Sequence, residues 1–126
     1  MIARALRLRQ PFEFERVRKR GRSWSTRLLV LSVLANDLEH NRYGFAVGRR
    51  VGGAVRRNRV KRWLREAVRC LHPALAQGYD LVFIARGPLA DESVSYQQVA
   101  GAVDSLCRRA GLLAASPPDC CLEAAP

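Results

Sequence analysis

The chain has 126 residues, enough for one domain with a single hydrophobic core but not for two. Its hydrophobic content of 48% is typical of a folded protein and excludes a wholly disordered one. The 22 lysines and arginines outnumber 11 acidic residues, giving a net charge of +11. The partner is therefore expected to be a polyanion, nucleic acid or an anionic membrane surface, with nucleic acid favoured.

The longest apolar run, residues 28–35, has the length of a strand and is too short to span a membrane. Residues 1–9 alternate arginine with leucine and lack the long apolar stretch of a signal peptide. We therefore expect a cytoplasmic protein that has no membrane partner.

The first predicted elements are a helix and two strands. Pro11 in a first turn and Gly21 just past a last turn predict a helix over residues 11–20. Residues 27–35 and 43–48 have the composition of strands, with a polar turn between them. In the second strand large and small side chains alternate, so one face is expected to pack and the other to leave its backbone open to close approach. The large ones are Tyr43, Phe45 and Val47, and the small ones are Gly44, Ala46 and Gly48.

The second half of the chain predicts a long helix, a strand and a last helix. The long helix covers residues 54–71, and the solid apolar run 79–85 predicts a buried strand. Ser95 and Gln98 form a capping-box pattern that begins the last helix, and Gly111 ends it. The order α-β-β(-β)-α-β-α indicates an α+β fold, a small α/β sandwich with its helices on one side of the sheet.

Domain boundaries and cysteines complete this outline. Residues 1–113 are expected to form one domain, and residues 114–126, with two prolines and no periodicity, a disordered tail. The four cysteines have no zinc-binding spacing, so they are expected to be reduced and without function. They are Cys70 and Cys107, at apolar helix positions, and Cys120 and Cys121, in the tail.

Residues 49–69 carry most of the positive charge, with nine basic residues and a single acid, Glu66. Helical spacing divides this segment into two faces. The apolar face, expected to pack on the sheet, consists of Val60, Leu64, Ala67, Val68 and Leu71. The opposite face consists of Asn58, Arg62, Arg65 and Arg69, flanked by Arg59 and Lys61. Like charges one turn apart repel each other, so this face is expected to meet an anion.

The string VGGAVRRNRVKRWLRE, residues 51–66, resembles the RNR motif of the ribonuclease P protein family. In that family a G-x-A-V-x-R-N-x-x-K-R segment follows a strand and forms the long helix. Every typical position of that segment is present between Gly52 and Arg62, and the resemblance extends over residues 6–113.

The resemblance implies an α/β sandwich with a left-handed βαβ crossover, although physical principle alone favours a right-handed one. It implies a protein subunit that binds a catalytic RNA and the 5′ leader of precursor tRNA, while the RNA supplies the active site and holds most of the Mg²⁺. No obligate protein partner, and no catalytic or certain metal-binding residue of its own, is expected. The residues implied to face the catalytic RNA are Arg57, Asn58, Arg59, Lys61, Arg62, Arg65 and Arg69. Those implied to line a leader-binding cleft beside the first helix are Phe14, Val30, Ala46, Arg49 and Arg50.

Two alternatives remain open at this point. A structural RNA-binding protein, such as a ribosomal protein, would explain the charge and the fold class but not the spacing of the RNR string. An autonomous nuclease would need His40 or His72 as a catalytic base, and neither has an evident partner in the sequence. Phe14 also has a second interpretation, as a residue of the hydrophobic core.

Overall fold

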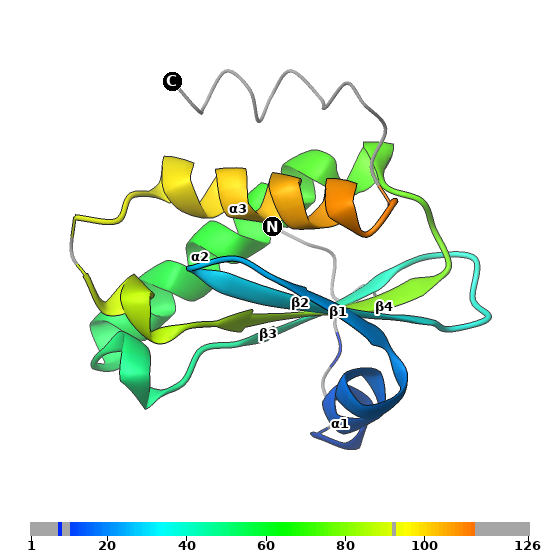
Figure 1. The fold of residues 1–126 in the computed structure, drawn as a ribbon, viewed down its shortest axis with the longest axis horizontal. Helices are drawn as coiled ribbons and strands as arrows, with labels where there is room; N and C mark the ends of the chain where they lie inside the picture. The colour runs from blue at the N-terminus through cyan, green and yellow to red at the C-terminus, as the bar shows by residue number, and fades with distance from the viewer. Residues whose placement is uncertain (1–7, 9–10, 92, 113–126) are drawn as a thin grey trace.

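The computed structural model describes Leu8, residues 11–91 and residues 93–112 (Figure 1). Its helices are α1 (Pro11–Arg20), α2 (Ala54–Leu71) and α3 (Tyr96–Arg109). Its strands are β1 (Arg22–Ser25), β2 (Leu29–Ala35), β3 (Arg42–Ala46) and β4 (Tyr79–Ala85). Short 3-10 turns are η2 (Arg49–Val51), η3 (His72–Ala74) and η4 (Gly87–Ala90). The predicted tail, with Cys120 and Cys121, lies outside the described residues.

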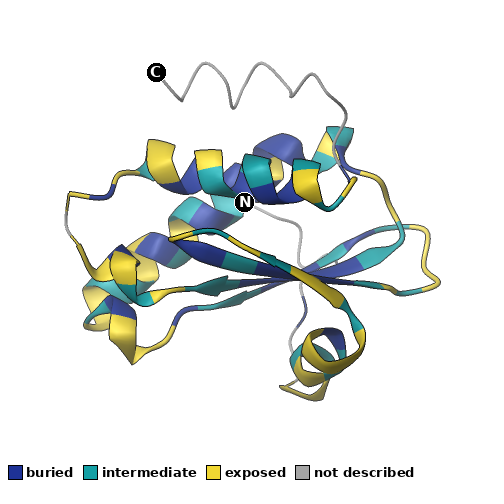
Figure 2. Cartoon of the chain, viewed as in Figure 1, coloured by how far each residue is buried: buried dark blue, intermediate teal, exposed yellow. Residues whose placement is uncertain are grey.

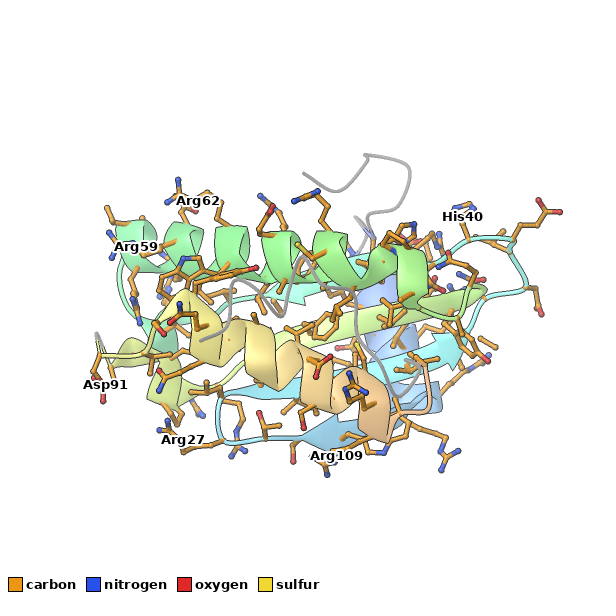
Figure 3. The ribbon with its side chains drawn as sticks, turned by 90° about the horizontal axis from the view of Figure 1, so that it is seen from above. Arg27, His40, Arg59, Arg62, Asp91 and Arg109 are labelled. Carbon is orange, nitrogen blue, oxygen red and sulfur yellow. The ribbon has the colours of Figure 1, made fainter. Side chains whose placement is uncertain are left out.

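The strands form one sheet in the order β1-β2-β4-β3. β2 is antiparallel to both β1 and β4, whereas β3 and β4 are parallel neighbours joined by α2. Figure 3 views the sheet from the side that carries α2 and α3. If the picture is turned so that the parallel strands β3 and β4 point upward, β4 lies to the left of β3. This crossover is left-handed, as the family resemblance implied and against the usual preference.

The helices do not all lie on one side of the sheet, so that part of the sequence prediction is wrong. Helices α2 and α3 cover one face and α1 covers the other (Figure 1). The reason lies in β4, whose apolar side chains point both ways: Leu81 and Phe83 join the main core, while Val82 packs with Val17 of α1. A strand that is apolar on both faces needs a cover on each.

The main core lies between the sheet and the pair α2 and α3, and the central strands β2 and β4 are the most continuously buried strands (Figure 2). Much of the outward surface of α1 is exposed in the same view. A smaller cluster under α1 consists of Leu8, Val17 and Val82, with Phe14, Leu34 and Ile84 packed against it. The second interpretation of Phe14, as an apolar packing residue, is therefore part of its role.

The observed bounds agree with most predicted ones. α1, α2 and β4 match the sequence prediction residue for residue, and the Ser95–Gln98 capping box begins α3. The strand predicted over residues 27–35 begins only at Leu29, because the backbone N–H groups of Leu28 and Leu29 donate to the Thr26 hydroxyl and keep residues 26–28 out of the strand. β1 was not named by the sequence analysis, although the predicted order left room for a third strand. No described helix is both long and apolar enough to cross a membrane.

Candidate nucleic-acid interface

The two-faced character of α2 is confirmed. Val60, Leu64, Ala67, Val68 and Leu71 are all buried against the sheet or α3. Asn58, Arg59, Arg62 and Arg69 are exposed, and Arg57, Lys61 and Arg65 are partly exposed. Arg62 lies on the outer side of α2 (Figure 3). The helix thus anchors itself by its apolar stripe and presents its basic stripe outward.

Most of this basic stripe has no acidic partner among the described residues. In the part of the chain that the structure describes, no ion pair or side-chain hydrogen bond involves Arg57, Arg59, Lys61, Arg62 or Arg65. An open depression of about 470 Å³ lies over the stripe. It is lined by Val55, Asn58, Arg59, Lys61, Arg62 and Arg65. Unpaired cations around a depression form a surface that an anionic strand can occupy.

Arg69 differs from the other arginines of the stripe, because its guanidinium binds Glu66 in the preceding turn. The Nε–Oε2 distance is 3.0 Å, and the hydrogen bond from Arg69 lowers the pKa of the Glu66 carboxyl. The positive charge of Arg69 is therefore partly balanced within the helix, although the residue stays on the exposed face.

Arg56 has a structural role that the sequence did not indicate. Its guanidinium lies 5.2 Å from the centroid of the Trp63 ring and donates to the carbonyl oxygens of Leu89 and Asp91, at 2.9 Å each. Arg56 thereby ties η4 to the first turns of α2 and is not part of the unpaired stripe.

The residues expected to line a leader-binding cleft gather on the α1 side of the sheet. Val30 pairs with Ile84 and Ile84 with Ala46, so these three form one cross-strand row on the face that carries α1. The Phe14 ring lies over Gly44 in the neighbouring row, where a Cβ atom would be only 2.7 Å from its Cζ. The open backbone predicted for β3 is thus covered, at Gly44, by the chain itself.

Two more of these residues, Arg49 and Arg50, follow β3 in η2, and both are exposed. They place two positive charges three and four residues beyond Ala46, the last residue of β3. The expected cleft residues are therefore neighbours in the fold, with an apolar part on the sheet and a basic part at its end.

A buried carboxylate that sequence analysis missed holds α1 on this face. Asp80, in β4, has no exposed surface and accepts hydrogen bonds from Arg42 at 2.9 and 2.8 Å, from Asn36 at 2.9 Å and from Arg16 of α1 at 3.1 Å. Arg42 also binds Glu13 of α1, at 2.7 Å. Burial raises the pKa of Asp80, but the bonds from Arg42 and Asn36 outweigh it and hold the pKa below its usual 3.8. The sequence did contain a signal for this role, because Asp80 is the only charged residue in the otherwise apolar strand β4.

His72, Cys70 and Cys107 are partly or fully buried. His72 does have a partner, contrary to the sequence prediction, because its Nδ1 lies 2.7 Å from the Tyr43 hydroxyl. Burial lowers the pKa of His72 and raises that of Tyr43 to about 12. Cys70 and Cys107 are buried free thiols, and burial raises the pKa of Cys107 to about 12. Among the described residues, no three His, Cys, Asp or Glu side chains are grouped so that they could hold a metal ion.

A basic helix that lies over a small sheet and presents unpaired arginines outward defines a nucleic-acid-binding α+β protein. Comparison with known proteins makes this class specific. The family model for ribonuclease P matches residues 2–111, so the chain belongs to the ribonuclease P protein family.

Similar proteins agree in sequence and in fold. The ribonuclease P protein component of Roseiflexus castenholzii is 46% identical over 112 residues, which cover 89% of this chain and 91% of that protein. The corresponding protein of Clostridium botulinum is 43% identical over 107 residues, covering 84% and 95%. The solved RNase P protein of Staphylococcus aureus superposes with a TM-score of 0.79 at 28% identity, covering 88% of this chain and 100% of that one. For the protein of Thermotoga maritima the TM-score is 0.75 at 33% identity, covering 82% and 96%.

Proposed function

We propose that the chain is the non-catalytic protein subunit of ribonuclease P and binds the catalytic RNA along the outer face of α2. The observation that carries the proposal is the set of five cations on that face that have no acidic partner among the described residues. Asn58 lies among them and adds a neutral hydrogen-bonding group. Membership of the ribonuclease P family supports the same role.

The 5′ leader of precursor tRNA is proposed to bind on the α1 side of the sheet. Phe14 provides an aromatic ring there, Val30 and Ala46 provide an apolar floor, and Arg49 and Arg50 provide charge for phosphates. Single strands are bound in this way in general, by stacking of bases and by basic side chains along the backbone. The two RNA partners would then meet different faces of one small protein.

Catalysis is assigned in this proposal to the RNA, which would also hold the Mg²⁺ that hydrolysis needs. Among the residues that the structure describes, no three His, Cys, Asp or Glu side chains lie together as ligands for a metal ion. The cations of α2 would instead reduce the repulsion between RNA phosphates, and less Mg²⁺ would then be needed to bring them together. We place this work in the cytoplasm, without a membrane or an obligate protein partner.

Reconstitution tests the proposal. The catalytic RNA and a precursor tRNA from the same genome are mixed at increasing Mg²⁺, with and without the protein. We expect the protein to lower the Mg²⁺ concentration that gives half-maximal leader removal, and the charge-reversed double variant Arg59→Glu/Arg62→Glu to lose much of this effect. An unchanged Mg²⁺ requirement with wild-type protein would show that the proposal is wrong.

Two further measurements separate the alternatives. Purification from cells should recover one large non-ribosomal RNA with the protein, whereas a ribosomal protein would bring ribosomal subunits. Protein alone should leave RNA intact. Cutting that disappears in His40→Ala or His72→Ala would instead indicate an autonomous nuclease.

A further inference from the structure

A second hollow lies beside the basic stripe, in a groove of about 540 Å³ where α2 meets the start of α3. It is mainly apolar, unlike the depression over the stripe, and has an aromatic side chain from each helix. Its lining residues are Arg62, Trp63, Arg65, Glu66 and Tyr96.

The aromatic wall of the groove is held firmly in place. Trp63 is partly buried and packs against the main core, and the Arg56 guanidinium lies 5.2 Å from its ring centroid. Tyr96, the first residue of α3, packs against the same core. Rings fixed in this way can contact a flat partner at little entropic cost.

The charged rim links this groove to the basic stripe. Arg62 and Arg65 line both hollows, so the groove and the depression share one wall. Neither arginine has an acidic partner in the described part of the chain, and the buried Nε of Arg65 has no hydrogen-bond acceptor there. A phosphate bound on this shared wall would bring its attached base within reach of the groove.

We propose that the groove receives one unpaired nucleobase of the RNA that binds along α2. Trp63 and Tyr96 contact the base, while Arg62 and Arg65 hold the phosphates beside it. This inference rests on the proposed function and adds to it a subsite for an unstacked nucleotide. Glu66 argues for a neutral base inside the groove, because its carboxylate would repel a phosphate or an acidic peptide there.

The test uses the chain's two tryptophans as a matched pair. Trp63 and Trp24 both pack partly buried against the main core, and both have an arginine over the ring, at 5.2 and 5.5 Å. Only Trp63 lies on α2. We expect Trp63→Leu to weaken binding of the same-genome catalytic RNA about fivefold to a hundredfold, the loss for one stacked base. Trp24→Leu should bind close to wild type.

The salt dependence distinguishes a stacked base from a lost phosphate contact. The Trp63 ring is neutral, so the log–log slope of affinity against salt should be the same in Trp63→Leu as in wild type. Trp63→Phe keeps an aromatic ring and should recover most of the affinity. A Trp63→Leu protein that binds as tightly as wild type overturns the inference.

Fluorescence gives a readout that survives if Trp63→Leu fails to fold. In a Trp24→Phe protein the tryptophan fluorescence comes from Trp63 alone, and addition of the catalytic RNA should quench it. Unchanged emission at saturating RNA contradicts a base in the groove. If wild-type protein neither binds the catalytic RNA nor lowers the Mg²⁺ requirement, the proposed function itself is wrong. If wild-type protein binds the catalytic RNA and lowers the Mg²⁺ requirement, but neither Trp63→Leu nor the Trp63 fluorescence shows an effect, only the assignment of the groove is wrong.

Discussion

Asp80 is the buried residue whose hydrogen bonds hold α1 against the sheet. It lies fully buried between two arginines and an asparagine, and each of them belongs to a different part of the chain. A buried carboxylate is tolerated only when such partners replace the water that it loses. One side chain therefore connects α1, the end of β2, β3 and β4.

Asp80→Asn should lower the free energy of unfolding by about 3 kcal/mol, because it removes the buried charge that pairs with both Arg42 and Arg16 and leaves Arg42 only Glu13. The matched control is Asp104→Asn, since the Asp104–Arg108 pair lies within one helix and is partly exposed. That substitution should lower the free energy of unfolding by less than about 1 kcal/mol. Urea denaturation of both variants makes the measurement, and equal losses would contradict a special role for Asp80.

The same residue predicts an acid dependence. The pKa of Asp80 is lower in the folded protein than its ordinary 3.8, so its contribution is complete above pH 3.8 and is lost as the pH falls through the folded value. Wild type should therefore lose more stability than Asp80→Asn between pH 4 and strongly acidic solution. Parallel curves for the two proteins would argue against this assignment.

Single arginines of the stripe should each account for about one phosphate. Arg62→Ala is expected to reduce the salt slope of RNA binding by about one unit and to weaken all RNA partners alike. Arg109→Ala removes the same charge from the end of α3, where the guanidinium donates to the Ser25 carbonyl oxygen, so it should leave the slope unchanged. Filter binding across a range of salt concentrations compares them.

Among the elements, α1 packs so closely on the sheet that two positions require glycine. Gly21 ends the helix as predicted, but not through a left-handed backbone. A Cβ atom there would collide with the Val33 carbonyl group of β2 and lie 2.5 Å from the Val17 carbonyl oxygen of α1, so the close approach of α1 and β2 requires glycine. Gly44 plays the same part on β3, beneath the Phe14 ring.

Gly44→Ala should cost about 1 kcal/mol, because the added methyl group must displace the Phe14 ring. The penalty should shrink in a Phe14→Leu background, where the ring that would collide is gone. Gly48→Ala, at a glycine with nothing within 4 Å, is the control and should cost less than Gly44→Ala. Thermal unfolding of the four combinations at positions 14 and 44 tests the coupling, and additive losses would refute it.

The sequence predicted those elements whose pattern is local. α2 and β4 are set by helical periodicity and by a solid apolar run, so their bounds could be read residue by residue. β1 was not named because its four residues are mostly exposed and it exists only by pairing with β2. The basic stripe was predictable for the same reason as α2, since helical spacing alone decides which residues share a face.

At the scale of the whole molecule, contacts between residues far apart in the chain determine the features that could not be predicted from the sequence. The side on which α1 packs depends on the strand order, and no local pattern encodes it. The contacts of Asp80 with Arg42 and of Tyr43 with His72 join residues 38 and 29 positions apart. The handedness of the β3–α2–β4 crossover was implied by family resemblance and not by physical preference.

The net charge of +11 should dominate binding to RNA. If about six to eight phosphates are contacted, the log–log slope of affinity against salt should lie near −4 to −7. The slope is measured with the catalytic RNA over moderate salt concentrations. A flat response would contradict the electrostatic account of the α2 face.

Because α1 packs on its own small cluster, we expect it to open as a unit separate from the rest of the molecule. Its apolar cluster is small and its other ties are ionic, whereas α2 and α3 share the main core. Opening of α1 should therefore require less free energy than global unfolding, and its amide hydrogens should exchange with solvent before those of α2. Strongly acidic solution that protonates Asp80 should release α1 while α2 stays folded. Binding at the proposed leader surface should then fail before binding of RNA along α2 does.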